Sequence, residues 1–267
     1  MSLRDSFREL LKSGPGKAGV FLLLVLVVLS AYVLVRFPLD FGQTKWSDPA
    51  EWANNPQAAP PMWSTLLSGK DRVRHTRLFS DNPNETTISR MGEVRTYRMF
   101  LELDSDEPPT FTIFIVSGVT FHANPPVLAV SMTRPDDKEV LLYRRVVRGP
   151  RPGEAAPFER FSQEPLRVKL TTDISVADAL GDFFRKEYGL DISRNQLMPA
   201  MNKAMFAMPD KGSPDGLRLL HGVYELTLQT TVDDPRDSVK SVEFIVGGSV
   251  FGLMGTDAQG RDLIQGL

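Results

Sequence analysis

One stretch near the N-terminus constrains this chain more than any other. Residues 18–35 read AGVFLLLVLVVLSAYVLV, with no charged side chain and only one serine and one tyrosine among the apolar residues. As a helix rising about 1.5 Å per residue, such a segment spans about 27 Å, close to the roughly 30 Å of a bilayer core. Lys17 and Arg36 bracket it, and their long side chains can reach the headgroups. The sequence therefore predicts a transmembrane helix over residues 18–36.

A cleaved signal peptide is the alternative for this segment. The apolar run is long for the core of a signal peptide, and no A-x-A cleavage site follows it. Basic residues precede the run at positions 4, 8, 12 and 17, whereas only Lys45 falls in the stretch that follows Arg36. The positive-inside rule then predicts a cytoplasmic tail at residues 1–17 and an extracytoplasmic main domain, in an inner or plasma membrane.

Two interpretations are possible for the tail, residues 1–17, and two for the tryptophans of the segment after the span, residues 37–71. Apolar residues at helical spacing over 3–11 indicate a short amphipathic helix closed by Gly14-Pro15-Gly16, or a frayed tail. Residues 37–71 form a connector rich in proline, and all three tryptophans, Trp46, Trp52 and Trp63, lie in it. Tryptophan this close to a span lies at the membrane interface or packs against the outer domain.

Residues 72–250 alternate between apolar and polar side chains, as strands with one buried face do. Strands are predicted over 95–103, 111–116, 127–132, 139–147, 223–232 and 239–246, with turns at 134–137 and 233–238. Two helices interrupt them, one capped by Ser175 and ended by Gly189, the other over 198–208 with a stripe of methionines. We interpret the methionines as core rather than as an adaptable binding surface. The expected fold is a mainly β, sandwich-like α+β extracytoplasmic domain.

Composition and motifs argue against several functions. The chain of 267 residues has no cysteine, which excludes disulfides and thiolate metal sites, and a net charge of -2 gives no reason to expect nucleic acid. His75, His122 and His221 have no paired spacing, and the acidic run 104–107 fits a solvated turn better than a calcium loop. No GxSxG, HExxH or Walker A sequence occurs. We therefore predict no catalytic, cofactor-binding or metal-binding residues, and no enzyme.

The end of the chain, residues 251–267, contains Gly255-Thr256-Asp257-Ala-Gln-Gly260-Arg261-Asp262. Gly255 can turn the chain, and the T-D-A-Q sequence that follows has the form of a capping box. Asp257 and Arg261 have the i,i+4 spacing of a helical ion pair, which leaves Asp262 free for a partner. With apolar residues at 263, 264 and 267, the pattern predicts the start of an amphipathic helix at the end of the outer domain, which the sequence cuts short.

This string resembles the GTDxxGRD signature of permease subunits in the dipeptide/oligopeptide/nickel class of binding-protein-dependent ABC importers. In that family the signature follows the first span on the outer side and precedes the second span. The resemblance implies a permease for peptides or similar small solutes. It also implies three partners besides the lipid bilayer: a second permease subunit, cytoplasmic ATPase subunits and an extracytoplasmic substrate-binding protein.

The resemblance covers only the first span and the residues of the signature. The family usually has a short loop between these features, whereas some two hundred residues intervene here, and Gln265-Gly266 stand where Ser-Arg is common. The later spans are missing, so the chain is interpreted as an N-terminal fragment. Two alternatives are a single-pass membrane-anchored protein whose outer domain binds a ligand or partner, and an anchored extracytoplasmic enzyme.

Overall fold

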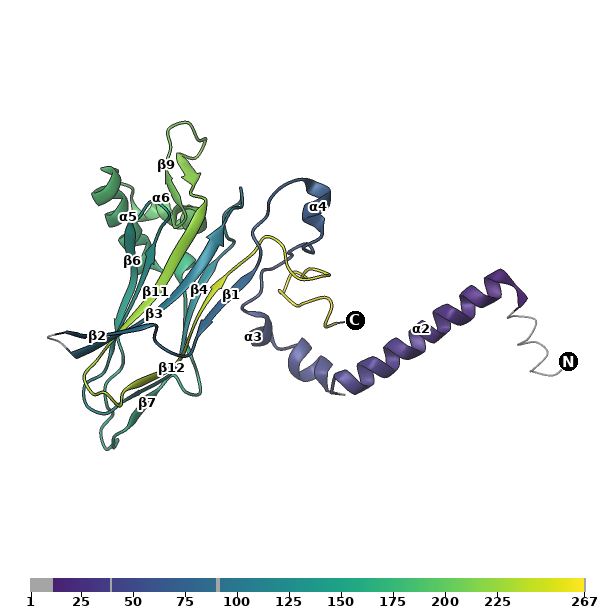
Figure 1. Ribbon diagram of the computed structural model, residues 1–267, viewed down its shortest axis with the longest axis horizontal. Coiled ribbons are helices and arrows are strands. Elements are labelled where there is room, and N and C mark those ends of the chain that lie inside the picture. Colours follow the sequence, from purple (N-terminus) through teal and green to yellow (C-terminus); the bar gives the residue numbers. More distant parts are fainter. Residues whose placement is uncertain (1–11, 39, 90–91, 267) are drawn as a thin grey trace. The chain divides into compact units, whose positions relative to one another are not determined.

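The computed structural model describes residues 12–38, 40–89 and 92–266, and the chain divides into two compact units (Figure 1). The first unit is Met1–Glu51 and the second is Trp52–Leu267. The second unit thus begins inside the predicted connector, well before the expected domain boundary at residue 72. Each unit is described by itself below.

The first unit contains α2, Gly14–Arg36, a helix of 23 residues that by length and composition could cross a membrane. Its most apolar window of 18 residues has a mean hydropathy of 2.9, and none of that window is buried. The helix begins four residues before the predicted start, because the Ser13 side chain accepts a hydrogen bond from the Gly16 amide and proline is suited to a first turn. Gly14-Pro15-Gly16 therefore form the first turn of α2, directly after a helical residue at position 12 and a bend at position 13. Most of the expected amphipathic segment lies outside the described residues.

Short helical turns follow in the connector. They are a π-helical turn at Gly42–Trp46, α3 at Pro49–Trp52 and α4 at Ser64–Ser68. The last of these belongs to the second unit.

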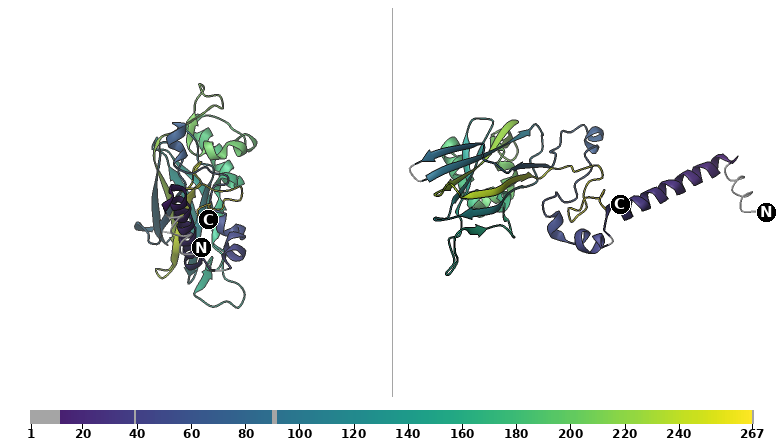
Figure 2. Two further views of the ribbon diagram at one scale, coloured as in Figure 1. Left: turned by 90° about the vertical axis from the view of Figure 1, so that its right-hand side faces the viewer. Right: turned by 60° about the horizontal axis from the view of Figure 1, so that its bottom comes forward.

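Two antiparallel sheets build the second unit. One has the order β1-β12-β4-β7, with β8 also paired to β4, and the other has the order β2-β3-β11-β5-β6. Figure 2 shows the sheets from two further sides. The strands run over Thr76–Ser80 (β1), Glu85–Ser89 (β2), Gly92–Leu103 (β3), Thr112–Phe121 (β4), Val127–Thr133 (β5), Glu139–Val146 (β6), Phe158–Arg160 (β7), Leu166–Lys169 (β8), Gly222–Val232 (β11) and Ser238–Val246 (β12).

The predicted alternation is confirmed in β3 and β11, whereas β4 is buried on both faces because Ile113 and Ile115 form a second apolar cluster with Phe111 and Ile245. In β3, Tyr97 and Leu101 are buried while Arg98 and Glu102 are exposed. The inward side chains of the two sheets meet in one hydrophobic core, where the ring of Phe114 of β4 lies 6.4 Å from that of Tyr143 of β6, measured between centroids. The domain is mainly β and built of antiparallel sheets, as expected.

The turn at 233–238 forms, but the strands that it joins do not pair with each other. β11 pairs with β3 and β5, whereas β12 pairs with β1 and β4. The turn therefore carries the chain from one sheet to the other. In contrast, β5 and β6 form a hairpin across residues 134–138.

One end of the sheets carries the helices (Figure 1). The helix α5, Ile174–Tyr188, buries Val176, Leu180 and Phe184, and Gly189 ends it with φ of 67°. Its N-cap is Asp173, whose carboxylate accepts from the Ser175 amide, so the prediction of Ser175 as the cap was wrong by two residues.

The predicted second helix is broken into short pieces. They are α6 (Arg194–Leu197), a 3-10 turn (Met198–Ala200) and α7 (Met201–Ala204), and a small hairpin of β9 (Ala207–Pro209) and β10 (Leu217–Leu219) follows. Met201 and Met205 are almost completely buried, which confirms their interpretation as core residues.

Candidate functional site

The residues of the GTDxxGRD string lie in a loop that runs beside the first residues of the second unit. We call residues 251–266 the C-terminal loop and residues 52–63 the entry segment. Backbone hydrogen bonds join them at four places: Phe251 N to Pro60 O (2.9 Å), Met62 N to Gly252 O (3.0 Å), Thr256 N to Ala59 O (2.8 Å) and Ala58 N to Asp257 O (2.7 Å). The two ends of the β domain therefore lie side by side.

Thr256 is the centre of this contact. Its side chain is buried, donates to the carbonyl oxygen of Pro56 at 2.7 Å and accepts from the amide of Ala59 at 3.0 Å. Both partners come from the entry segment, about two hundred residues earlier in the chain. Thr256 therefore binds a distant backbone, instead of capping a helix that follows it.

The two glycines of the string allow close approach as well as a turn. Gly255 has φ of 79°, and a Cβ atom added there would lie 2.4 Å from the carbonyl oxygen of Ala59. Gly260 has φ of 81°, and an added Cβ would lie 3.1 Å from the carbonyl oxygen of Trp52. Its own carbonyl accepts from the Asn55 side chain at 3.0 Å. Each glycine is thus required by its backbone conformation and by its contact with the entry segment.

Asp257 and Arg261 form the expected ion pair, with Nε and Nη2 each 2.6 Å from Oδ2. The other carboxylate oxygen accepts from the backbone amides of Gln259 and Arg261 at 2.9 and 3.0 Å. Partial burial raises the pKa of Asp257, but these hydrogen bonds and the Arg261 charge outweigh it and leave the pKa below the ordinary value. The pair closes a tight turn within the loop.

Asp262 also has partners in its own turn. Its carboxylate accepts from the Ile264 amide at 3.1 Å and from the Gln265 side chain at 3.2 Å, and its backbone pairs with Thr256 in an isolated antiparallel bridge. The expectation that Asp262 is left without a role inside the chain was therefore wrong.

The predicted amphipathic helix over 256–267 is absent from residues 256–266, which form turns. The two glycines with positive φ interrupt any helical run, and Thr256 is committed to the entry segment. Leu263 and Ile264 remain exposed, so no buried apolar stripe favours a helix. The motif is a compact docked loop in this structure.

Two tryptophans of the connector differ in their environment, and the sequence allowed either packing against the domain or a position at the membrane interface. Trp52 is buried in the second unit with 6% of its surface exposed. Trp63 is 53% exposed, and its indole N–H donates to the carbonyl of Leu253 at 2.9 Å. Packing against the domain thus explains Trp52 but leaves the ring of Trp63 facing outward.

His75 lies next to the C-terminal loop. Its ring is 5.2 Å from that of Phe251 and 6.3 Å from that of Phe111, measured between centroids, and neither ring nitrogen has a hydrogen-bond partner. Burial, with a smaller contribution from the positive charge of Arg77, lowers the pKa of His75 to about 4. The imidazole is therefore neutral at pH 7 and acts as an aromatic packing group.

His122 lies beside two aspartates that the sequence did not connect with it. The nearest ligand atoms of His122, Asp234 and Asp237 lie within 4.8 Å of one another, a group that could hold a metal ion. However, both carboxylate oxygens of Asp237 already accept hydrogen bonds, and Asp234 is paired with Arg236 at 2.6 Å. No local signal links β4 to the turn at 233–238, because only the sheet topology brings them together.

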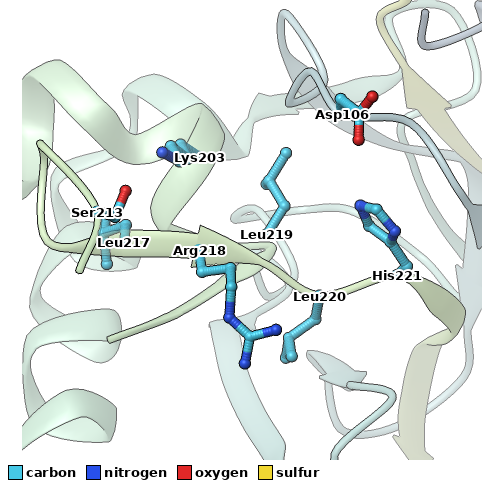
Figure 3. A pocket seen from close by; sticks show the side chains of 8 residues that line it. All are labelled: Asp106, Lys203, Ser213, Leu217, Arg218, Leu219, Leu220 and His221. Atoms are coloured by element: carbon cyan, nitrogen blue, oxygen red, sulfur yellow. The ribbon is translucent and has the colours of Figure 1, made fainter. Parts of the chain in front are cut away.

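Two surface pockets of the described residues are lined largely by polar and charged side chains. One of about 560 Å³ lies beside the β9–β10 hairpin, with Asp106 and His221 on one side and Lys203 and Ser213 on the other (Figure 3). Lys203 is held by Asp215 at 2.6 Å, and Asp106 belongs to the acidic run 104–107, which is a loop as predicted. A second pocket, of about 460 Å³ beside α5, is likewise lined by paired charges such as Asp178 and Arg194.

Comparisons with known proteins add little to this geometry. No protein-family model matches the chain, and no curated protein matches it. One similar solved structure is a chain from infectious bursal disease virus, Gx strain, with 10% sequence identity and a TM-score of 0.29. The match covers 66% of this chain and 32% of the viral chain, so this chain corresponds to about a third of that chain's length. A likeness at this level carries no argument about function.

Proposed function

We propose that this chain is the N-terminal part of a permease subunit of an ABC importer for peptides or similar small solutes. In this proposal α2 is the first membrane span, with its N-terminus in the cytoplasm. The β domain is an extracytoplasmic insertion before the second span. The GTDxxGRD string directs the chain from that domain back toward the membrane.

The observation that supports the proposal most is the pairing of the entry segment with the C-terminal loop. A domain inserted between two spans must receive the chain from the membrane and return it there. That return is simplest when the two ends of the domain lie together, as in tolerated domain insertions. A single-pass protein, the alternative function, has no such requirement for its last residues.

The motif acts in this proposal through position and not through chemistry. Every fixed polar residue of the string has a partner: Thr256 in the entry segment, Asp257 and Arg261 in each other, and Asp262 in the following turn. In this proposal the loop, bonded to the entry segment at residues 251–260, transmits movement of the domain to the span that follows and so contributes to gating at the outer mouth of the pathway.

Two steps test the proposal. First, the coding sequence downstream of residue 267 should encode further apolar segments of about 20 residues each. Second, the complete protein, tagged and purified from native membranes in mild detergent, should bring down a second permease and ATPases carrying a Walker A sequence. Recovery without either partner, from a gene that encodes no further spans, would favour the single-pass alternative.

Transport provides the functional arm of the test. Cells lacking the gene should lose uptake of at least one probe among a radiolabelled dipeptide, a radiolabelled pentapeptide and radioactive nickel. Re-expressed Arg261→Ala should insert normally but restore less uptake, because the loop loses its internal ion pair. Arg218→Ala, whose exposed side chain lies at the β10 strand, serves as the matched control and should restore uptake fully. Equal uptake by both variants would remove the gating role from the motif.

A further inference from the structure

An unusually apolar surface lies on the entry side of the second unit. We call it the apolar face, and its side chains are each at least two-fifths exposed: Met62 (42%), Trp63 (53%), Leu66 (85%), Leu67 (80%), Leu253 (63%) and Met254 (45%). Single exposed apolar residues are ordinary, but a group of this size marks an interaction site.

The two chain segments of the apolar face are held together by hydrogen bonds. The amide of Met62 donates to the carbonyl of Gly252 at 3.0 Å, and the indole of Trp63 donates to the carbonyl of Leu253 at 2.9 Å. Leu66 and Leu67 follow on α4, whose end is fixed by Gly69 in the left-handed conformation. The face is therefore a folded feature of the domain and not a loose tail.

Charge distinguishes the apolar face from the rest of the domain surface. Residues 52–69 include no acidic or basic side chain, while Glu51 precedes them and Lys70, Asp71 and Arg72 follow. A surface in contact with water normally carries interspersed charges, and the outward faces of β2 and β3 do so with Glu85, Arg98 and Glu102. An uncharged apolar surface bordered by charged residues of both signs suits the boundary between acyl chains and polar headgroups.

Chain connectivity also favours a position of the apolar face near the membrane. It is built from the entry segment and the C-terminal loop, the two ends through which the proposed permease would join its domain to the spans. Only residues 37–51 separate α2 from the second unit, and even an extended chain of that length reaches at most about 50 Å. A tether of this length keeps the entry segment within about 50 Å of the end of α2.

We propose that the apolar face docks onto the outer leaflet of the membrane, with Leu66 and Leu67 in the acyl boundary and the Trp63 ring among the headgroups. Tryptophan favours this depth because its ring is apolar while its N–H can be hydrogen-bonded, as it is here to Leu253. The proposal rests on the membrane anchoring within the proposed function, but it does not require transport.

The cysteine-free chain allows a direct test by spin labelling, since each introduced cysteine is the sole thiol. A nitroxide is attached to the full chain in phosphatidylcholine–phosphatidylglycerol vesicles at one of three positions: Leu66→Cys on the apolar face, Ile88→Cys on β2 or Leu26→Cys in α2. Leu66 and Ile88 are matched controls, because their exposed fractions are 85% and 87%. Collision rates with oxygen, which concentrates in lipid, and with a water-soluble nickel chelate are then compared.

We expect the oxygen-to-nickel collision ratio at Leu66→Cys to be several-fold higher than at Ile88→Cys, and lower than at Leu26→Cys. Leu253→Cys, from the other segment of the face, should behave like Leu66→Cys. A watery environment at Leu66→Cys together with lipid at Leu26→Cys would overturn the docking while leaving the anchoring intact. Protection of Leu66→Cys from both reagents would indicate a protein neighbour instead of lipid and also overturn it. Water at Leu26→Cys would remove the anchoring itself.

Discussion

The helix α5 and the C-terminal loop start from similar local signals and end in different structures. Each begins with a residue type that caps helices, and each has a glycine where the chain turns. In α5, five apolar side chains at helical spacing enter the core, whereas in the loop Leu263 and Ile264 stay exposed. The comparison teaches that capping signals locate a helix only where a buried stripe stabilises it.

The largest effect is expected from removing that stripe. Phe184 is fully buried and packs its ring 5.8 Å from that of Tyr188, so Phe184→Ala should lower the free energy of unfolding of the domain by about 4 kcal/mol. Ile264→Ala in the loop should cost less than about 1 kcal/mol, since Ile264 is 43% exposed. Thermal denaturation of the full chain in detergent measures both, and equal losses would break the comparison.

The next largest effect on stability is expected to differ between Gly189 and Gly255, although both have a positive φ. Gly189→Ala at the end of α5 has no atom within 4 Å of the added Cβ and should cost about 1 kcal/mol. Gly255→Ala should cost about 3 kcal/mol, because its Cβ would also collide with the Ala59 carbonyl. Hydrogen exchange should show opening of residues 55–62 and 251–262 only in Gly255→Ala. Similar exchange in both variants would mean that the loop does not depend on close approach.

A smaller effect concerns the hydroxyl of Thr256. Thr256→Val keeps the shape but leaves the Pro56 carbonyl and the Ala59 amide without their partner, at a cost of about 2 kcal/mol to loop docking. Thr256→Ser retains both hydrogen bonds and should behave almost as the natural protein. Hydrogen exchange of the Ala59 amide reports the difference, and fast exchange in Thr256→Ser would assign the effect to the methyl group.

The smallest effect is a pH dependence of the domain's stability that arises from His75, which lies beside the C-terminal loop. The pKa of His75 is about 4 in the folded protein, so between that value and its ordinary value near 6.5 the unfolded chain binds more protons. Stability should therefore fall by about 1–2 kcal/mol as pH drops from 7 to 4, and partial solvent exposure keeps the loss below the full value of the shift.

A variant isolates the contribution of this histidine. His75→Leu keeps an apolar group beside Phe251 and should flatten the pH profile over that interval. Denaturant titrations at stepped pH values provide the measurement. An unchanged profile in His75→Leu would assign the dependence to other groups.

Much of the candidate site could not be predicted because its partners lie far away in the sequence. The ion pair of Asp257 and Arg261 was accessible, since four residues separate them. The contact of Thr256 with Pro56 was not, because no pattern within the string names a partner two hundred residues earlier. Gly255 was interpreted as a turn residue, but the close approach of Gly255 and Gly260 to the entry segment is a property of the folded domain.

By itself, the sequence determined the apolar helix, the alternating strands and α5, because each depends on side-chain periodicity within a single segment. Only the tertiary structure decided that β11 and β12 belong to different sheets and that the GTDxxGRD string docks as a loop. Both outcomes depend on which distant backbone groups are available for hydrogen bonding. A segment without a buried stripe adopts the conformation that satisfies those groups, and local propensity then has little influence.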